Sequence, residues 1–482
     1  MAAHLATVAV PDASLLPGRG ACLPVGLMEE AVAEAGCRER RRRLLPALAV
    51  MVFVLGCCLF CGEGYGEVAR KLAGWLAPLA GRPGWHLPGT SALAKARARV
   101  GAAPFELLFF KLAGPLADTA TPGAAAFGRL LVALDGTRLD VPFTPANVAA
   151  FGPPPRGGGP DARGGYPQAR LVTLAGCGSH GLADAVFGPR AGGGSSEQDL
   201  ARQLAGHGRL GPGMLVIADR GFCGHPVAAA LAGTGADVLI RARADQYLPV
   251  LGMLADGSHR SVLPDPAAAR ALWRRNGQRR RRGSPVPPDP RSSLPGLAIR
   301  VIEADITISS AGQPPRTGRC RLITTLADPA AAPAEQVAAC YAQRWETENG
   351  YREIKVFTRG ARRVLRSRHP AGIAQEIWAL LCACQLTHTA RAHAAAGAGH
   401  DPDRISYTIT LRAIRRAITT PGTSITAEAL ASLLPPRRHR RYPRLSTAST
   451  ARRRTARAQH PATATYHITI AAPAQATDLP GP

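Results

Sequence analysis

Two short apolar runs, each ended by an aspartate, constrain the fold of this chain most strongly. Residues 130–134 and 214–218 are continuously apolar, which is typical of strands buried on both faces of a mostly parallel sheet. The first run leads into Asp135-Gly136 and the second into Asp219-Arg220-Gly221. The sequence therefore predicts an α/β fold with two carboxylates at the carboxyl ends of its strands, where an open sheet has its functional crevice.

The residues before these strands have helical periodicity. Residues 21–120 are expected to form an all-helical region, after a loose leader at 1–20. Within it, residues 90–100 predict a helix capped by Thr90 or Ser91. That helix has three alternating basic residues that wrap round one side: Lys95, Arg97 and Arg99. They fit either a DNA-reading helix or a solvated helix face, and both interpretations remain open.

The later part of the chain alternates between strand and helix patterns. Residues 246–328 predict a strand-rich insertion interrupted by a polybasic loop around 273–282. Helices are expected at 372–395 and 406–417. A basic tail punctuated by prolines follows at 435–482.

Residues 334–355 predict a helix with an unusual polar stripe. Tyr341, Arg344, Glu348 and Lys355 follow at steps of three, four and seven. At about 100° per residue, the four side chains project within an arc of roughly 60°. A core-facing helix would place apolar residues on such a stripe. The pattern indicates a carboxylate held among phosphate-binding donors, although taken alone it also fits a solvated face.

Three carboxylates stand out as ligands for hard divalent cations. Mg²⁺ prefers a few protein oxygens together with oxygens of a substrate phosphate. Two such ions can activate a hydroxyl nucleophile and stabilise the leaving oxygen in phosphoryl transfer. Turn chemistry alone explains either strand-end aspartate, but not their combination with the polar stripe. The candidate ligands are Asp135, Asp219 and Glu348.

Other nearby carboxylates fit the trio less well. On a continuous helix, Glu346 and Glu353 lie about 160° and 140° away from Glu348. In an unbroken strand, Asp140 faces the side of the sheet opposite to Asp135. All three are therefore left out of the predicted site.

The charge balance favours a polyanionic partner. The chain of 482 residues has 59 Lys and Arg against 33 Asp and Glu, a net charge of +26. Nucleic acid is the first candidate for such a partner and an anionic membrane the second. Abundant Ala, Gly, Pro and Arg also indicate a GC-rich genome, which raises the arginine content by itself.

An apolar run near the N-terminus raises the alternative of a membrane anchor. Residues 44–61 contain no charge and follow a basic cluster. The run is at the lower limit for spanning a bilayer and contains Pro46 and Gly56, so a buried helix is the preferred interpretation. The 11 scattered cysteines, including Cys57, Cys58 and Cys61, are interpreted as buried small residues in a reducing cytoplasm, not as zinc ligands.

The motifs together resemble a known family. The chain is similar to bacterial insertion-sequence transposases of the DDE class, specifically the insertion-sequence-four family. The resemblance extends over about residues 20–470 and includes the segments at 135–142 and 218–222. The spacing of Tyr, Arg, Glu and Lys within 341–355 is the family's hallmark.

The resemblance implies a fold and a site. The fold would be an RNase H-like catalytic domain over 125–370, in which 246–328 is the strand-rich insertion. The region at 21–120 would bind DNA, and a helical region at 371–434 would precede the tail. Asp135, Asp219 and Glu348 would be the metal-binding catalytic triad, and Tyr341, Arg344 and Lys355 would contact phosphates of the transposon end.

The resemblance also implies an activity. It is cut-and-paste transposition with Mg²⁺, for which Mn²⁺ can substitute, on double-stranded DNA in the cytoplasm, at the nucleoid. The substrates would be the terminal inverted repeats and the target DNA, and the protein would act as a homodimer. Some relatives flip a base with an insertion-domain Trp, a role that Trp273, the Trp of 246–328, would take in this chain. Departures from the family pattern at Cys223, Gly350 and Arg352 leave the triad intact, and the main alternative is an inactive DNA-binding descendant.

Overall fold

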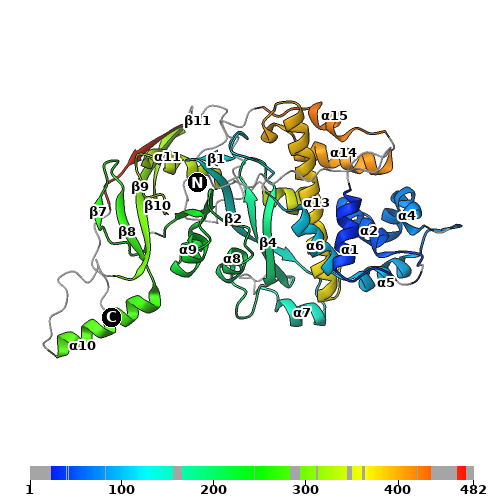
Figure 1. Cartoon of the computed structure of the whole chain (residues 1–482), viewed down its shortest axis with the longest axis horizontal. Helices are drawn as coiled ribbons and strands as arrows, with labels where there is room; N and C mark the ends of the chain where they lie inside the picture. Colours follow the sequence, from blue (N-terminus) through cyan, green and yellow to red (C-terminus); the bar gives the residue numbers. More distant parts are fainter. Residues whose placement is uncertain are drawn as a thin grey trace, which may run out of the picture. The chain divides into compact units, whose positions relative to one another are not determined.

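The chain forms two compact units, seen in a computed structural model (Figure 1). The structure describes residues 23–39, 41, 43–81, 83–114, 116–155, 165–243, 245–282, 294–310, 313–344, 350–360, 364–420, 422–435 and 464–473. The first unit comprises Met1–Ala124, Gly136–Ser196 and Glu346–Pro435. The second comprises Ala125–Asp135, Glu197–Trp345 and Pro436–Pro482. Each unit is therefore assembled from segments that are far apart in the sequence.

The first unit begins with a series of helices, in agreement with the helical periodicity. They are α1 (Val25–Glu34), α2 (Ala47–Leu59), α3 (Tyr65–Lys71), α4 (Ala73–Ala80), α5 (Thr90–Val100) and α6 (Ala103–Leu112). Helix α2 is buried almost all the way round, because its sequence has no charged or amide side chain to face water. The N-cap of α5 is Gly89, so the expected cap at Thr90 or Ser91 is wrong by one residue.

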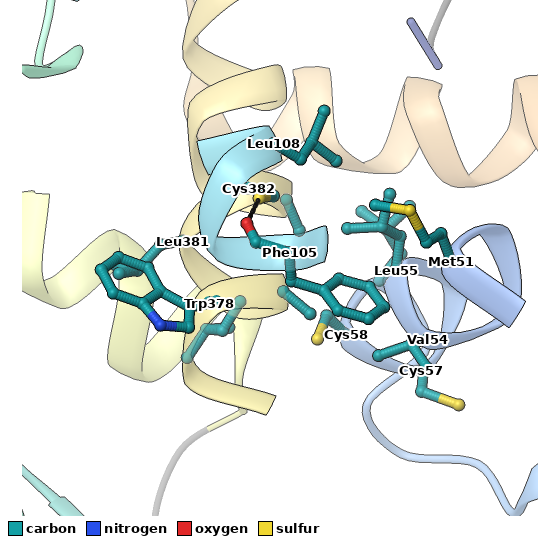
Figure 2. Packing of buried hydrophobic residues seen from close by; sticks show 14 of the residues in the cluster. Met51, Val54, Leu55, Cys57, Cys58, Phe105, Leu108, Trp378, Leu381 and Cys382 are labelled. Atoms are coloured by element: carbon teal, nitrogen blue, oxygen red, sulfur yellow. Dashed lines mark hydrogen bonds between the residues drawn. The ribbon is translucent and has the colours of Figure 1, made fainter. Parts of the chain in front are cut away.

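These N-terminal helices share one core with later segments of the same unit. Those segments are α7 (Pro145–Phe151), β3 (Gln168–Gly176), β4 (Leu182–Pro189), α13 (Pro370–Gly397), α14 (Tyr407–Thr419) and α15 (Ile425–Leu430). Figure 2 shows Phe105 of α6 between Leu55 of α2 and Trp378 of α13. The thiol of Cys382 donates to the carbonyl oxygen of Phe105 at 3.4 Å.

The second unit is built on a mixed sheet. Its strands are β1 (Ala125–Ala126), β2 (Arg129–Asp140), β5 (Met214–Ala218), β6 (Asp237–Arg241), β7 (Gly252–Met253), β8 (His259–Pro264), β9 (Gly296–Ser310), β10 (Gln313–Thr324) and β11 (Ala464–Ile470). Strand β2 continues past Asp135 into the first unit. The strands β2, β5 and β6 are parallel, as their continuous apolar burial predicts. Helices α8 (Glu197–Ala205) and α9 (His225–Ala232) precede β5 and β6.

Three sequence-based expectations need correction in this unit. The polybasic segment around 273–282 is not a loop but most of helix α10 (Pro266–Arg281). The tail contains a strand, β11, which pairs antiparallel with β9. The predicted helix over 334–355 is broken: α11 (Ala334–Cys340) is followed by the 3-10 turn η2 (Tyr341–Arg344).

The apolar run near the N-terminus is a buried helix of the first unit. Met51, Phe53 and Leu55 of α2 are each at most 1% exposed. Among the described residues, no helix is both long enough and apolar enough to cross a membrane.

Candidate active site

The strand register of the second unit aligns the two predicted aspartates. Strands β2 and β5 pair in parallel from Leu130 opposite Met214 to Leu134 opposite Ala218. Asp135 follows Leu134 and Asp219 follows Ala218, so the two aspartates are the next residues beyond the last pair. Neighbouring strands are about 4.8 Å apart, and residues in register project to the same face. The register therefore sets the two carboxylates side by side.

Asp135 differs from the expectation in one respect. Strand β2 does not end there but continues to Asp140. Asp135 is thus a residue within a long strand, at the point where parallel pairing with β5 stops. Its side chain is 16% exposed, so it is accessible without being fully solvated.

The Asp219 carboxylate has a local structural role as well. Asp219 is the N-cap of the 3-10 turn η1 (Arg220–Phe222), and its Oδ1 accepts a hydrogen bond of 2.7 Å from the backbone N–H of Gly221. A Cβ at position 221 would meet that oxygen at 2.9 Å, so glycine allows the close approach. The turn chemistry fixes the orientation of the carboxylate, and the turn and ligand interpretations are therefore compatible.

The 3-10 turn η2 brings two further predicted residues to this place. The Nη1 atom of Arg344 lies 3.7 Å from Oδ2 of Asp135, and the Arg344 side chain is 14% exposed. Burial raises the pKa of the Tyr341 phenol; the charge of Arg344 lowers it and that of Asp219 raises it again. The phenol is therefore neutral and close enough to both residues for their charges to act on it. Tyr341, Arg344, Asp135 and Asp219 form one neighbourhood in the second unit.

The remaining residues of the predicted polar stripe are placed differently. Glu348 lies outside the described residues, as does Glu346. Lys355 lies in the first unit, in the π-helix η3 (Glu353–Thr358), and is partly buried. Because η2 and η3 both depart from α-helical geometry, the angles drawn on a continuous α-helix do not describe this segment.

Glu353 is a buried carboxylate of the first unit. Its angle on a continuous helix had excluded it from the predicted site. It lies 3.1 Å from His180 Nδ1, 3.5 Å from Arg391 Nη1 and 3.8 Å from His388 Nε2. Burial opposes its ionisation, but His180 and Arg391 outweigh that effect and hold its pKa well below the usual range. No sequence pattern indicated this cluster, because its members come from separate elements.

A basic cavity adjoins Asp219 in the second unit. Its volume is about 1120 Å³, and its lining contains five arginines against two carboxylates. The basic residues are Arg220, Arg241, Arg243, Arg319 and Arg321, and the acidic ones are Asp245 and Glu303. Arg321 pairs with Glu303 at 2.9 Å. The net positive lining suits an anionic ligand such as a phosphate.

These arginines were missed in the sequence analysis, although two signals were present. Arg220 belongs to the Asp-Arg-Gly motif itself. Arg319 and Arg321 are two residues apart on β10, and that spacing places both side chains on one face of a strand. The sequence alone does not reveal that β10 pairs with β6, so it could not place these arginines at the cavity.

The predicted DNA contacts on α5 have different environments. The Arg97 side chain is buried and donates to Gln375 Oε1 and Ser367 Oγ, both at 2.6 Å. It therefore supports the core of the first unit, and its expected role as a DNA contact is corrected. Arg99 donates to Glu39 Oε1 at 3.2 Å, whereas Lys95 is exposed.

The donor set at the two aspartates is compatible with a hard divalent cation. Two partly exposed carboxylates stand side by side beside a cationic cavity, and carboxylate oxygens are the ligands that Mg²⁺ prefers. Among the described residues, no group of three or more His, Cys, Asp or Glu side chains could hold a metal ion.

Comparison with known proteins places the chain in a family. Residues 126–386 match the family model described as Transposase DDE domain, which covers more than half of the sequence, so this chain is a DDE transposase. Residues 20–110 match Insertion element 4 transposase N-terminal. The chain is 29% identical over 444 residues to Transposase InsG for insertion sequence element IS4 of Escherichia coli (strain K12), covering 89% of this chain and 91% of that protein. The predicted resemblance to the insertion-sequence-four family is confirmed.

A solved structure also overlaps this one. It is the cryo-EM structure of piggyBac transposase synaptic complex with hairpin DNA, with a TM-score of 0.40, 10% sequence identity, and coverage of 85% of this chain and 79% of that chain. The family membership makes the protein a DNA-binding enzyme with transposase activity, and DDE domains generally use divalent metal ions.

Proposed function

We propose that the protein catalyses Mg²⁺-dependent cut-and-paste transposition, with Asp135, Asp219 and Glu348 as its metal ligands. The observation that carries this proposal is the register of β2 and β5, which sets Asp135 beside Asp219 at the point where parallel pairing stops. Mn²⁺ is expected to substitute for Mg²⁺, because both favour carboxylate and water oxygens. When bound, the metal would supply Lewis-acid stabilisation of charge on the reacting phosphate.

The protein's own residues then position the DNA. Arg344 lies against Asp135 and presents a guanidinium suited to bidentate phosphate contact. Tyr341 remains a neutral hydroxyl, because burial raises its pKa, and can donate a hydrogen bond to a phosphate oxygen. The arginines of the cavity beside Asp219 hold the strand whose phosphate reacts. Lys355, in the first unit, is proposed as a further phosphate contact that acts as a point charge.

We also propose that the catalytic core is RNase H-like. The support is the order in which the strands follow one another in the chain. Strand β2 is followed by an antiparallel hairpin, β3 and β4, and then by β5 and β6, which run parallel to β2. In the same proposal, 246–328 is the insertion, and β7, β8, β9 and β10 supply its strands. The protein is proposed to act as a homodimer that bridges two transposon ends.

The test uses purified protein and DNA that carries the terminal inverted repeats flanking this reading frame. With Mg²⁺ or Mn²⁺, the wild type should cleave this DNA and join the ends to a target. Asp135→Asn, Asp219→Asn and Glu348→Gln should each abolish cleavage but leave binding of the repeat DNA within about twofold. These isosteric changes remove a ligand charge without removing volume.

A matched control is Asp199→Asn on α8. Asp199 pairs with Arg202 one turn away on the surface, so the change should leave cleavage intact. Metal binding can be read independently from the Mn²⁺ electron paramagnetic resonance signal. Asp219→Asn should weaken that binding by roughly tenfold or more, since loss of even an outer-shell partner has that effect. A Glu348→Gln protein that cuts like the wild type would refute the triad. If the wild type binds the repeats but cleaves DNA with neither Mg²⁺ nor Mn²⁺, the alternative of an inactive DNA-binding descendant holds.

A further inference from the structure

Helix α10 of the second unit has one buried face and one arginine-rich face. Its buried side is formed by Ala269, Leu272 and Asn276, of which Ala269 and Leu272 pack against Val262 of β8. Its exposed arginines are Arg270, Arg274, Arg275, Arg279 and Arg281. No acidic residue occurs between the ends of the helix, so nothing within it neutralises this charge. The exposed face of α10 is therefore positively charged.

Three of the exposed arginines are arranged in a line along the helix. At about 100° per residue, Arg270, Arg274 and Arg281 fall within an arc of roughly 40°, on the side away from the buried residues. The Nε atom of Arg270 donates to the Pro266 carbonyl at 2.9 Å, and that of Arg274 to the Arg270 carbonyl at 3.4 Å. Neither bond uses the outer guanidinium nitrogens, which are the ones that bind a phosphate bidentately.

The start of α10 lies at the basic cavity beside Asp219. Pro264 and Pro266 line that cavity together with Arg220 and Gly221, the two residues after Asp219. Asp265 caps the helix, because its Oδ1 accepts from the backbone N–H groups of Ala267 and Ala268 at 2.8 and 3.0 Å. The helix follows β8 directly (Figure 1). The row of arginines on α10 thus begins at Arg270, four residues after Pro266 at the cavity.

The length of this surface matches a duplex segment. A helix of 16 residues is about 24 Å long at 1.5 Å per residue. One strand of B-DNA advances about 3.4 Å per nucleotide, so α10 spans roughly seven base pairs. The three aligned arginines lie about 6 and 10 Å apart along the helix axis, so they can meet phosphates of one strand without reading the bases.

We propose that α10 binds the backbone of the target DNA, next to the site of strand joining. This inference rests on the proposed function. A transposase must recognise its own ends by sequence but must accept many target sequences, and a row of arginines reads charge without sequence. Among the helix side chains that the structure describes, Gln278 is an exposed amide, and Trp273 is 47% exposed at the flank of the row. The chemistry of the surface therefore fits the sequence-independent partner.

The test is a binding measurement that requires no catalysis. The full-length protein is first loaded with terminal-repeat DNA in Ca²⁺, and the binding of a second, unrelated 30-base-pair duplex is followed by fluorescence anisotropy over a range of salt concentrations. The variant is the triple change Arg270→Gln, Arg274→Gln and Arg281→Gln. Its affinity for the second duplex should fall at least tenfold, and the slope of log K against log salt should fall by about 2 to 3, near 0.9 per lost contact. Its affinity for the terminal repeats should stay within twofold.

Two further proteins make the result specific. A triple change of exposed, ion-paired arginines elsewhere, Arg70→Gln, Arg202→Gln and Arg416→Gln, removes the same charge and should leave second-duplex binding within about threefold. Lysine at the three α10 positions retains the charge and should restore most of the affinity. The inference is overturned if the α10 glutamine variant binds the second duplex like the wild type. It is equally overturned if affinity for the terminal repeats falls in step, since α10 would then bind the transposon end.

Cleavage with Mg²⁺ is measured separately on the wild type. A wild type that fails to cleave contradicts the proposed chemistry, whereas the binding result depends only on how α10 meets DNA. The two failures are therefore distinguishable.

Discussion

The imidazole of His180 bridges two buried carboxylates of the first unit: its Nδ1 lies 3.1 Å from Glu353 Oε2, and its Nε2 lies 3.4 Å from Asp403 Oδ1. The three side chains are at most 6% exposed. Arg391 approaches Glu353 at 3.5 Å from helix α13. Glu353 lies in the same π-helix as Lys355, so this cluster anchors a segment of the family's signature to the core of the unit.

Glu353→Gln should destabilise the first unit strongly. The change leaves Arg391 buried without the carboxylate that it approaches and removes one of the two carboxylates that His180 bridges. Loss of one partner of a buried pair costs about 3 to 5 kcal/mol. The measurement is the free energy of unfolding from denaturant titration. The control is Glu428→Gln, which removes only a surface pair with Arg416 and should cost less than about 1 kcal/mol. Equal stability of the two variants would show that the cluster contributes little.

Acid should destabilise the protein through the same cluster. Burial lowers the pKa of His388 to about 3, from 6.5 in the unfolded chain. The unfolded state therefore takes up this proton first, and stability falls as the pH falls from 6.5 towards 3. The pKa of Glu353 is also lowered, so its contribution is lost as the pH falls below 4.5.

The measurement for this pH dependence is the free energy of unfolding between pH 7 and pH 4. The glutamine of His388→Gln cannot titrate. The free energy of unfolding of this variant should therefore depend less steeply on pH than that of the wild type, by up to about 1.4 kcal/mol per pH unit. Identical slopes for the two proteins would contradict a neutral, buried His388.

The parts of the fold that the sequence predicted are those determined by local pattern. The run at 214–218 became β5 because five apolar residues in a row can be satisfied only by burial on both faces. Strand β6 is buried in the same way at Val238, Leu239 and Ile240. The strand-end aspartates followed from these strands, which is why two of the proposed ligands are found side by side.

The parts that the sequence did not predict depend on non-local contacts or on irregular backbone. Strand β11 forms only by pairing with β9, which lies more than 150 residues earlier, so no local pattern reveals it. The departure from α-helix at Tyr341 and the π-helix at Glu353 shift the direction of every later side chain. For α10, the apolar spacing of Ala269 and Leu272 was present, but the run of arginines concealed it.

Arg97→Met should act on stability and not directly on DNA. Arg97 is 8% exposed, and its loss leaves Gln375 Oε1 without this donor and removes the positive charge 3.7 Å from Glu376. A cost of about 3 kcal/mol is expected in the free energy of unfolding. Lys95→Ala, two residues away and exposed, should leave stability unchanged and, if α5 faces DNA, reduce the salt dependence of binding by about 0.9. An Arg97→Met protein as stable as the wild type would contradict the structural role.

Arg344→Ala should distinguish two roles of the guanidinium beside the proposed metal site: contact with a phosphate and electrostatic competition with Mg²⁺. Loss of the guanidinium removes a phosphate donor, which should slow cleavage by roughly 10² to 10³-fold. It also removes a positive charge 3.7 Å from the Asp135 carboxylate, so the Mg²⁺ concentration for half-maximal rate should fall, because the site attracts cations more strongly. Arg344→Lys keeps the charge but loses the planar fork, so it should slow cleavage and leave the Mg²⁺ requirement near that of the wild type. Cleavage rates over a Mg²⁺ titration give both quantities, and an Arg344→Ala protein that needs more Mg²⁺ than the wild type would show that Arg344 positions Asp135 and does not compete with its cation.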